Sequence, residues 1–128
     1  MNDLNNPSTW VDLAEEDYLT AQSALRRRKP LVHSSCFHAQ QCAEKYLKAL
    51  LVSRGRTFPR VHDLLLLSTL SEQSGILLPI EASQLHTLTD FSVRVRYPGE
   101  TPTVEDAREA LSIAKSVRKH ARSQLGIR

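Results

Sequence analysis

Arg56 and His62 are the two residues of this sequence whose types and spacing point to the most specific chemistry. They lie in the stretch RTFPRVHDLLLL, with five residues between them. A histidine can take a proton from a ribose 2′-hydroxyl or give one to the leaving oxygen, and an arginine can stabilise the charged phosphorane. Together on one phosphate they can cleave RNA without a metal ion. Arg56 and His62 are therefore the candidate catalytic residues.

The favoured interpretation of this pair is a structural one. His62 then begins a helix, and Arg56 is a solvated cation of the preceding loop. The alternative is that His62 approaches Arg94 and Arg96 in space and supplies them with an imidazole, because the groups of an active site need spatial rather than sequence proximity.

A polar stripe follows the segment CFHAQQCAEKYLKALL at helical spacing. Its members are His38, Gln41, Lys45 and Lys48, at steps of three, four and three. Such a stripe can hold a phosphate backbone through its two lysines. The favoured interpretation is the solvated face of an amphipathic helix, and Glu44 also forms a favourable i, i+4 pair with Lys48.

Asp17 is an unusual carboxylate because it falls among apolar residues that should face inward. Those residues are Trp10, Leu13, Ala21 and Ala24. A buried carboxylate needs a partner, and we expect a cation from another helix, with Lys45 or Arg96 as candidates. The alternative is an Asp17 side chain that reaches water at the edge of the stripe. We assign Asp17 and Glu44 as buried polar residues with structural roles.

The elements that must position these residues all read as helices. Ser8 or Thr9 is the expected cap of a first helix that runs to about residue 29. Further helices are expected at about 32–54, 62–74, 80–94 and 104–125, the last capped by Thr103. Prolines fall between these segments, and the sequence has no long alternating pattern typical of a strand. The prediction is an all-α, antiparallel up-and-down bundle of four to five helices.

Length and composition limit the protein to one domain, residues 1–128. The chain has 41% hydrophobic residues and a net charge of +3, which allows an anionic partner without demanding one. Its two cysteines are too few for a zinc cluster and suit a reducing compartment. No secretory signal or apolar run of membrane-spanning length is present. We expect a cytoplasmic protein without membrane attachment, metal or cofactor.

Three motifs together resemble the HEPN domain, in the branch encoded beside a small nucleotidyltransferase of the MNT type. They are FHAQQCAEKYLKALL, then HDLLLL after one short loop, then RVRYP before the last helix, and they cover nearly the whole chain in order. The resemblance implies a helical bundle, a homodimer, and nucleotide or RNA binding near the dimer interface. Many relatives are ribonucleases or toxins of toxin–antitoxin pairs, which the partner nucleotidyltransferase silences. Candidates for an apolar dimer surface are Trp10, Phe91 and the leucines at 64–67.

The nuclease motif of that family is absent at its expected place. Nuclease members carry an arginine, four to six residues and a histidine near the end of the penultimate helix. Here the corresponding stretch reads DFSVRVRYPGETP, in which no histidine follows Arg94 and Arg96. Elsewhere the spacing has little weight, because chance alone supplies about one match in a chain with this many arginines and histidines. Whether the chain is an enzyme stays open at this point.

The function that the resemblance implies, together with the missing histidine, is a nucleotide- or RNA-binding regulatory module that acts with a small nucleotidyltransferase, in a toxin–antitoxin pair, without its own nuclease activity. The predicted binding residues are Arg94, Arg96, Tyr97, Lys45 and Lys48: guanidinium groups fork onto phosphate, and a tyrosine can stack on a base. One alternative is a metal-independent ribonuclease toxin with a nonstandard Arg/His arrangement. Another is a dimerisation bundle that binds no ligand.

Overall fold

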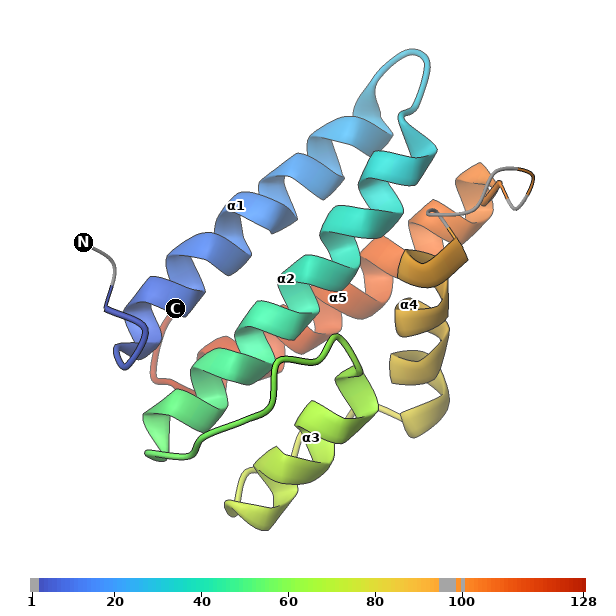
Figure 1. Ribbon diagram of the computed structural model, residues 1–128. Helices are drawn as coiled ribbons and strands as arrows, with labels where there is room; N and C mark the ends of the chain where they lie inside the picture. The colour runs from blue at the N-terminus through green and yellow to red at the C-terminus, as the bar shows by residue number, and fades with distance from the viewer. Residues whose placement is uncertain (1–2, 95–98, 100) are drawn as a thin grey trace.

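The computed structural model describes residues 3–94, 99 and 101–128. In this part of the chain, helices are joined by short connections (Figure 1). They are α1 (Pro7–Arg26), α2 (Val32–Ser53), α3 (Leu64–Gln73), α4 (Ala82–Arg94) and α5 (Val104–Gln124). The predicted all-α bundle of four to five helices is therefore confirmed.

Helix α2 is the central element and contacts the other four helices. Helix α1 runs antiparallel to α2, while α5 lies behind them and runs in the same direction as α2 (Figure 1). Helices α3 and α4 connect α2 to α5 and pack against α2 from one side. This central position requires apolar residues around much of α2, and Tyr46, Leu47, Leu50 and Leu51 are fully buried.

Helix α1 begins earlier and ends earlier than predicted. Its cap is Asn6, whose side chain accepts a hydrogen bond from the backbone N–H of Ser8 at 3.0 Å. The prediction of Ser8 or Thr9 as the cap was wrong, because Pro7 occupies the first helical position, where its missing N–H costs no hydrogen bond. The helix ends at Arg26, and the next residue is already extended.

Helices α3 and α4 each begin two residues later than predicted. Asp63 caps α3 and accepts hydrogen bonds from the backbone N–H groups of Leu65 and Leu66, so the helix starts at Leu64 and not at His62. The start of α4 at Ala82 rather than Ile80 follows from a tight turn, in which the Ile80 N–H donates to the carbonyl of Leu78 at 2.8 Å. His62 is consequently a loop residue.

Helices α2 and α5 follow their predicted bounds to within one residue. Thr103 caps α5 as expected, and its hydroxyl accepts from the Asp106 N–H at 3.0 Å while the Asp106 side chain accepts from the Thr103 N–H at 2.9 Å. This reciprocal capping box fixes the first turn of the helix that closes the bundle.

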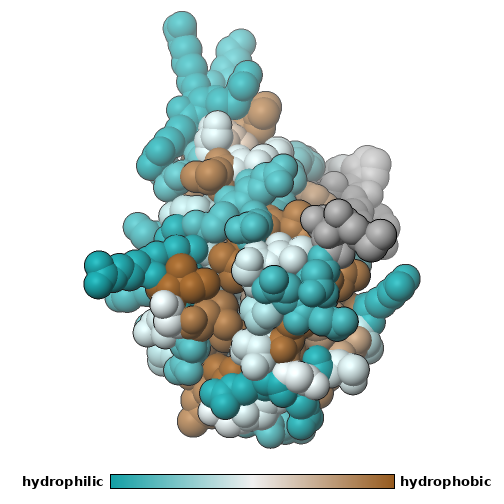
Figure 2. Space-filling model, turned by 90° about the vertical axis from the view of Figure 1, so that its left-hand side faces the viewer, coloured by the Kyte–Doolittle hydropathy of each residue, from teal (hydrophilic) through white to brown (hydrophobic). Residues whose placement is uncertain are grey.

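Apolar residues of all five helices form the core, and a few leucines remain outside it. In α3, Leu64 and Leu67 are buried, whereas Leu65 and Leu66 are 40% and 38% exposed. Phe91 is buried in the core and is not surplus apolar surface. On the side drawn in Figure 2, brown apolar patches are separated by hydrophilic side chains, and long hydrophilic side chains project at the α1–α2 end. Among the described residues, no helix combines the length and the apolar character needed to span a membrane.

Candidate functional site

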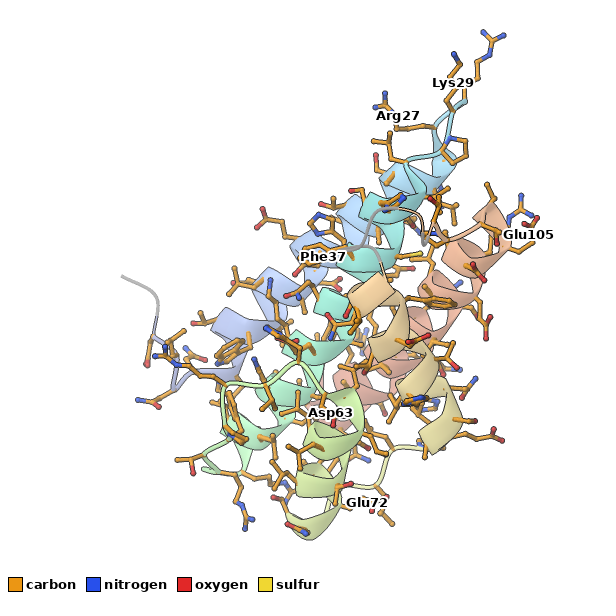
Figure 3. All side chains as sticks on the ribbon, turned by 45° about the vertical axis from the view of Figure 1, so that its right-hand side comes forward. Arg27, Lys29, Phe37, Asp63, Glu72 and Glu105 are labelled. Carbon is orange, nitrogen blue, oxygen red and sulfur yellow. The ribbon has the colours of Figure 1, made fainter. Side chains whose placement is uncertain are left out.

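A strip of polar residues on α2 forms the candidate site. His38, Gln41, Lys45 and Lys48 share one side of the helix because their spacing keeps them within a limited arc. In the first turns of α2 this side lies next to α1, and in the later turns it lies next to the 54–63 segment. That segment ends at Asp63, which Figure 3 labels. Two carboxylates, one from α1 and one from α2 itself, organise the strip.

The first carboxylate, Asp17 of α1, is held by two groups from α2. Its Oδ1 lies 2.7 Å from Nδ1 of His38, and its Oδ2 accepts a hydrogen bond from Nζ of Lys45 at 2.5 Å. The Asp17 side chain is 10% exposed. Lys45, one of the two cations expected from the sequence, is therefore a partner of Asp17, and His38 is a second partner that the sequence did not indicate. This cluster fixes α1 against α2.

The second carboxylate, Glu44, organises a larger group. Its Oε1 lies 2.7 Å from Nδ1 of His62 and accepts from Nε2 of Gln40 at 3.2 Å, and its Oε2 accepts from Nζ of Lys48 at 3.0 Å. Gln40 also donates to the backbone carbonyl of His62 at 3.0 Å. These bonds hold the loop before α3 onto α2. Glu44 and Gln40 are both buried, and the bonds give them the partners that buried polar groups need.

Lys48 is a buried cation whose surroundings are largely aromatic. Its Nζ lies 5.6 Å from the ring centroid of Trp10 and 5.5 Å from that of Phe58, and these two rings meet edge to face. With Glu44 and two rings as partners, the ammonium group is satisfied inside the protein. Lys45 is also ion-paired but is 23% exposed. The strip therefore offers a phosphate less free positive charge than its two lysines suggest.

His62, a loop residue that Glu44 holds beside the strip, has a geometry that suits proton transfer. Its side chain is 57% exposed although Nδ1 is bonded to Glu44. When Nδ1 carries the proton and donates it to the carboxylate, Nε2 keeps a lone pair that can accept a proton. A buried carboxylate that orients an exposed imidazole is the arrangement used for a general base. Arg56, the other candidate catalytic residue, is an exposed loop residue that lines a depression with Trp10, Lys48, Phe58 and Arg60.

A third carboxylate, Glu15, joins α1, α2 and α5. Arg118 donates two hydrogen bonds to it, from Nε at 2.7 Å and from Nη2 at 2.6 Å, and the Tyr46 hydroxyl donates to Oε2 at 2.6 Å. Nη1 of Arg122 lies 3.5 Å from Glu15 and donates to the Tyr46 hydroxyl at 3.2 Å. Sequence reasoning missed this network, because no local spacing links residues more than a hundred positions apart.

The charges of the Glu15 network shift several pKa values. Burial acts to raise the pKa of Glu15, but the hydrogen bonds from Arg118 and Tyr46 and the positive charges of the two arginines bring it below its ordinary value. Burial and the hydrogen bond to Glu15 raise the pKa of Tyr46. Burial likewise raises the pKa of the Cys42 thiol, so this cysteine is not a reactive nucleophile.

The predicted binding residues at the end of α4 are only partly covered by the structure. Arg94 is described as the last residue of α4, without its side chain, and Arg96 and Tyr97 lie outside the described residues. The alternative interpretation, in which His62 approaches Arg94 and Arg96, therefore stays a hypothesis. Within residues 3–94, 99 and 101–128, no three His, Cys, Asp or Glu side chains form a group that could hold a metal ion.

Comparisons with known proteins give a consistent result. The family model of the HEPN domain matches residues 8–124, from the first turn of α1 to the last residue of α5. The fold is similar to that of TT1696 from Thermus thermophilus, with a TM-score of 0.74 and 24% sequence identity, over 94% of this chain and 98% of that chain. It is also similar to ST0689, an archaeal HEPN homologue, with a TM-score of 0.69 and 27% identity over the same shares of the two chains. No protein with curated annotation matches the chain.

Proposed function

The chain belongs to the HEPN domain family, and from this premise we propose that it is a nucleotide- or RNA-binding regulatory module without nuclease activity of its own. The observation that carries the proposal is the stretch after α4. It offers Arg94, Arg96 and Tyr97 for phosphate and base, and no histidine follows before His120, far along α5. With no histidine at the motif spacing after Arg94 or Arg96, the site is expected to bind RNA without moving the proton that cleavage needs.

The neighbouring turn supports an anionic ligand at this end of the bundle. Residues 26–29 are four consecutive cations, all exposed, and Arg27 and Lys29 point away from the bundle in Figure 3. This turn adjoins the α4–α5 connection, because Leu31, Val32 and His33 line one depression together with Thr101 and Pro102. The imidazole of His33 therefore lies at this end of the bundle. We assign Lys45 a weaker, partly neutralised contact to the ligand, and Lys48 a structural role.

RNA binding tests the proposal directly. We expect the Arg94→Ala/Arg96→Ala variant to bind a short single-stranded RNA about tenfold more weakly than the parent chain. The slope of log affinity against log salt concentration should also become shallower, as expected for the loss of about two phosphate contacts. Fluorescence anisotropy in EDTA at several salt concentrations measures both quantities. The matched control is Arg54→Ala/Lys119→Ala, which removes two exposed cations far from the α4–α5 connection. Equal affinities for the parent chain and the Arg94/Arg96 variant would refute the proposal.

The partner we propose is a small nucleotidyltransferase of the MNT type, in a toxin–antitoxin pair in the cytoplasm, with the chain as a homodimer. The support is the order of the three motifs along the chain, which resembles the branch of the family that is encoded beside such an enzyme. A neighbouring gene for a short nucleotidyltransferase, whose product co-purifies with the chain, is the expected result. A neighbouring enzyme of that class that fails to bind the purified chain would count against it.

A second candidate function is favoured by one observation. Glu44 orients the exposed His62 ring as a general base, which suits a metal-independent ribonuclease with His62 and a nearby arginine such as Arg56. In that case RNA cleavage persists in EDTA and disappears in His62→Ala. A conservative Glu44→Gln variant would then lower the cleavage rate, because the amide no longer stabilises the imidazolium.

A further inference from the structure

The seam between α1 and α5 contains an open cleft. The two helices contact each other less than either contacts α2, so their facing sides stay partly separated. The cleft has a volume of about 390 Å³, within the range of small-molecule sites. It lies on a different side of the bundle from the α2 polar strip, since none of the α2 residues is among those that line it.

The cleft carries positive charge that the protein does not neutralise. Arg26 of α1 and Arg108 and Lys115 of α5 line it, and among the described residues that line it there is no carboxylate. Glu105 comes within 3.8 Å of Arg108, but both side chains are mostly exposed, so this pair is weak. Further along the seam, Glu15 is already engaged by two other arginines of α5. Three cations around one cleft therefore remain available to an anion.

The remaining walls of the cleft suit a flat apolar group. Leu25 and Leu111, both half-buried, supply most of the apolar surface, and Tyr18, which is 7% exposed, adds a small part of its side chain. The Tyr18 ring is held in place, because the Arg118 guanidinium lies 4.6 Å from its centroid and Gln22 donates to its hydroxyl at 3.4 Å. A preformed wall lowers the entropy lost when a ligand binds. Gln22 itself and Ser112 add hydrogen-bonding groups at the edge of the cleft.

We propose that the α1–α5 cleft is a binding site for a small phosphomonoester that carries a flat apolar or aromatic group. Arg26, Arg108 and Lys115 hold the phosphate, since guanidinium forks and an ammonium match its oxygens. The flat group lies against Leu25 and Leu111 and the small exposed part of Tyr18. This site borders the RNA-binding end assigned above, because Arg26 belongs to the basic turn at 26–29, but its other lining residues lie further along α1 and α5, and it goes beyond that function.

Nuclear magnetic resonance titration of the full chain with phenyl phosphate tests the site. Backbone amide shifts are expected to cluster in residues 18–26 and 108–115, and the affinity is expected to exceed that of inorganic phosphate and that of phenol by at least tenfold each. Adenosine 5′-monophosphate is a second probe: its binding at the same residues identifies nucleotides as the natural source of the phosphomonoester, and binding of phenyl phosphate alone points to smaller metabolites.

Charge variants supply the control. Arg108→Ala/Lys115→Ala is expected to weaken phenyl phosphate binding at least tenfold, while Arg54→Ala/Lys119→Ala, which removes two exposed cations outside the cleft, leaves it unchanged. Equal weakening by both variants would show diffuse charge attraction and overturn the site. Backbone amide shifts that do not cluster in the residues of the cleft would also overturn the site, as would a dimer in which the second copy covers the cleft. Arg94→Ala/Arg96→Ala should not change this binding, so failure here is distinguishable from failure of RNA binding.

Discussion

Three carboxylates engage much of the positive charge inside this protein, and of these Asp17 and Glu44 are buried while the Glu15 side chain is 26% exposed. Asp17, Glu44 and Glu15 each accept hydrogen bonds from at least two side chains, and each joins different segments of the chain. Removal of a carboxylate from water is tolerated only when such partners replace the solvent. Lysine and arginine side chains that look available for phosphate in the sequence are therefore partly used for structure.

Glu15→Gln provides a test at this scale. The neutral amide loses its charge-assisted bonds with Arg118, Arg122 and Tyr46, so we expect the free energy of unfolding to fall by about 2 kcal/mol at neutral pH. The pKa of Glu15 is lowered in the folded protein, so its stabilisation is present above the ordinary value of 4.5 and is lost as the pH falls through the lower folded value. Urea unfolding at several pH values should therefore show a smaller loss of stability in acid for the variant.

The control for that experiment is Glu16→Gln, which neutralises the adjacent, exposed residue of α1. We expect it to change the unfolding free energy by less than about 0.5 kcal/mol. Identical acid profiles for the parent chain and Glu15→Gln would mean that the Glu15 network contributes nothing to stability.

At the scale of the elements, short sequence patterns predicted most of the helices, but most side-chain pairs between different helices could not be predicted from the sequence. The apolar spacing of α2 and the Thr103 cap of α5 are encoded within a few residues, so both helices were predicted closely. The start of α3 was missed because Asp63 competes with His62 as a cap, and only the structure shows that Asp63 makes the bonds. The pair of Glu44 with His62 depends on the path of the 54–63 loop, which no spacing rule predicts.

Thr103→Ala tests the element that closes the bundle. It removes the hydroxyl that accepts from the Asp106 N–H, half of the capping box of α5. Loss of such a cap costs about 1 kcal/mol. Thermal or urea unfolding measures this, with the exposed Thr101→Ala as the neutral comparison. An unchanged midpoint in Thr103→Ala would mean that the cap does not stabilise α5.

At the scale of the whole molecule, the exposed leucines of α3 bear on the proposed homodimer. The leucines at 64–67 were among the candidates for an apolar dimer surface, and the structure buries Leu64 and Leu67 while Leu65 and Leu66 stay 40% and 38% exposed. Neighbouring exposed leucines favour an interface, because their burial against a second copy removes apolar area from water.

Leu65→Lys/Leu66→Lys is expected to convert the dimer to a monomer in sedimentation experiments, since two ammonium groups would have to be desolvated at the interface. Leu19→Lys/Leu31→Lys, which changes two leucines that are 60% and 47% exposed elsewhere, should leave the oligomeric state unchanged. A parent chain that sediments as a monomer at high concentration, or a dimer unaffected by the α3 substitutions, would contradict this assignment.

The proposed function combines RNA binding with the absence of RNA cleavage, and one measurement addresses both properties. An end-labelled single-stranded RNA is incubated with excess chain in EDTA, and samples are run on native and denaturing gels. We predict a retarded band on the native gel and intact RNA on the denaturing gel after hours of incubation. Fragments that accumulate with the parent chain and vanish with His62→Ala would contradict this account and establish the Glu44–His62 pair as a catalytic group.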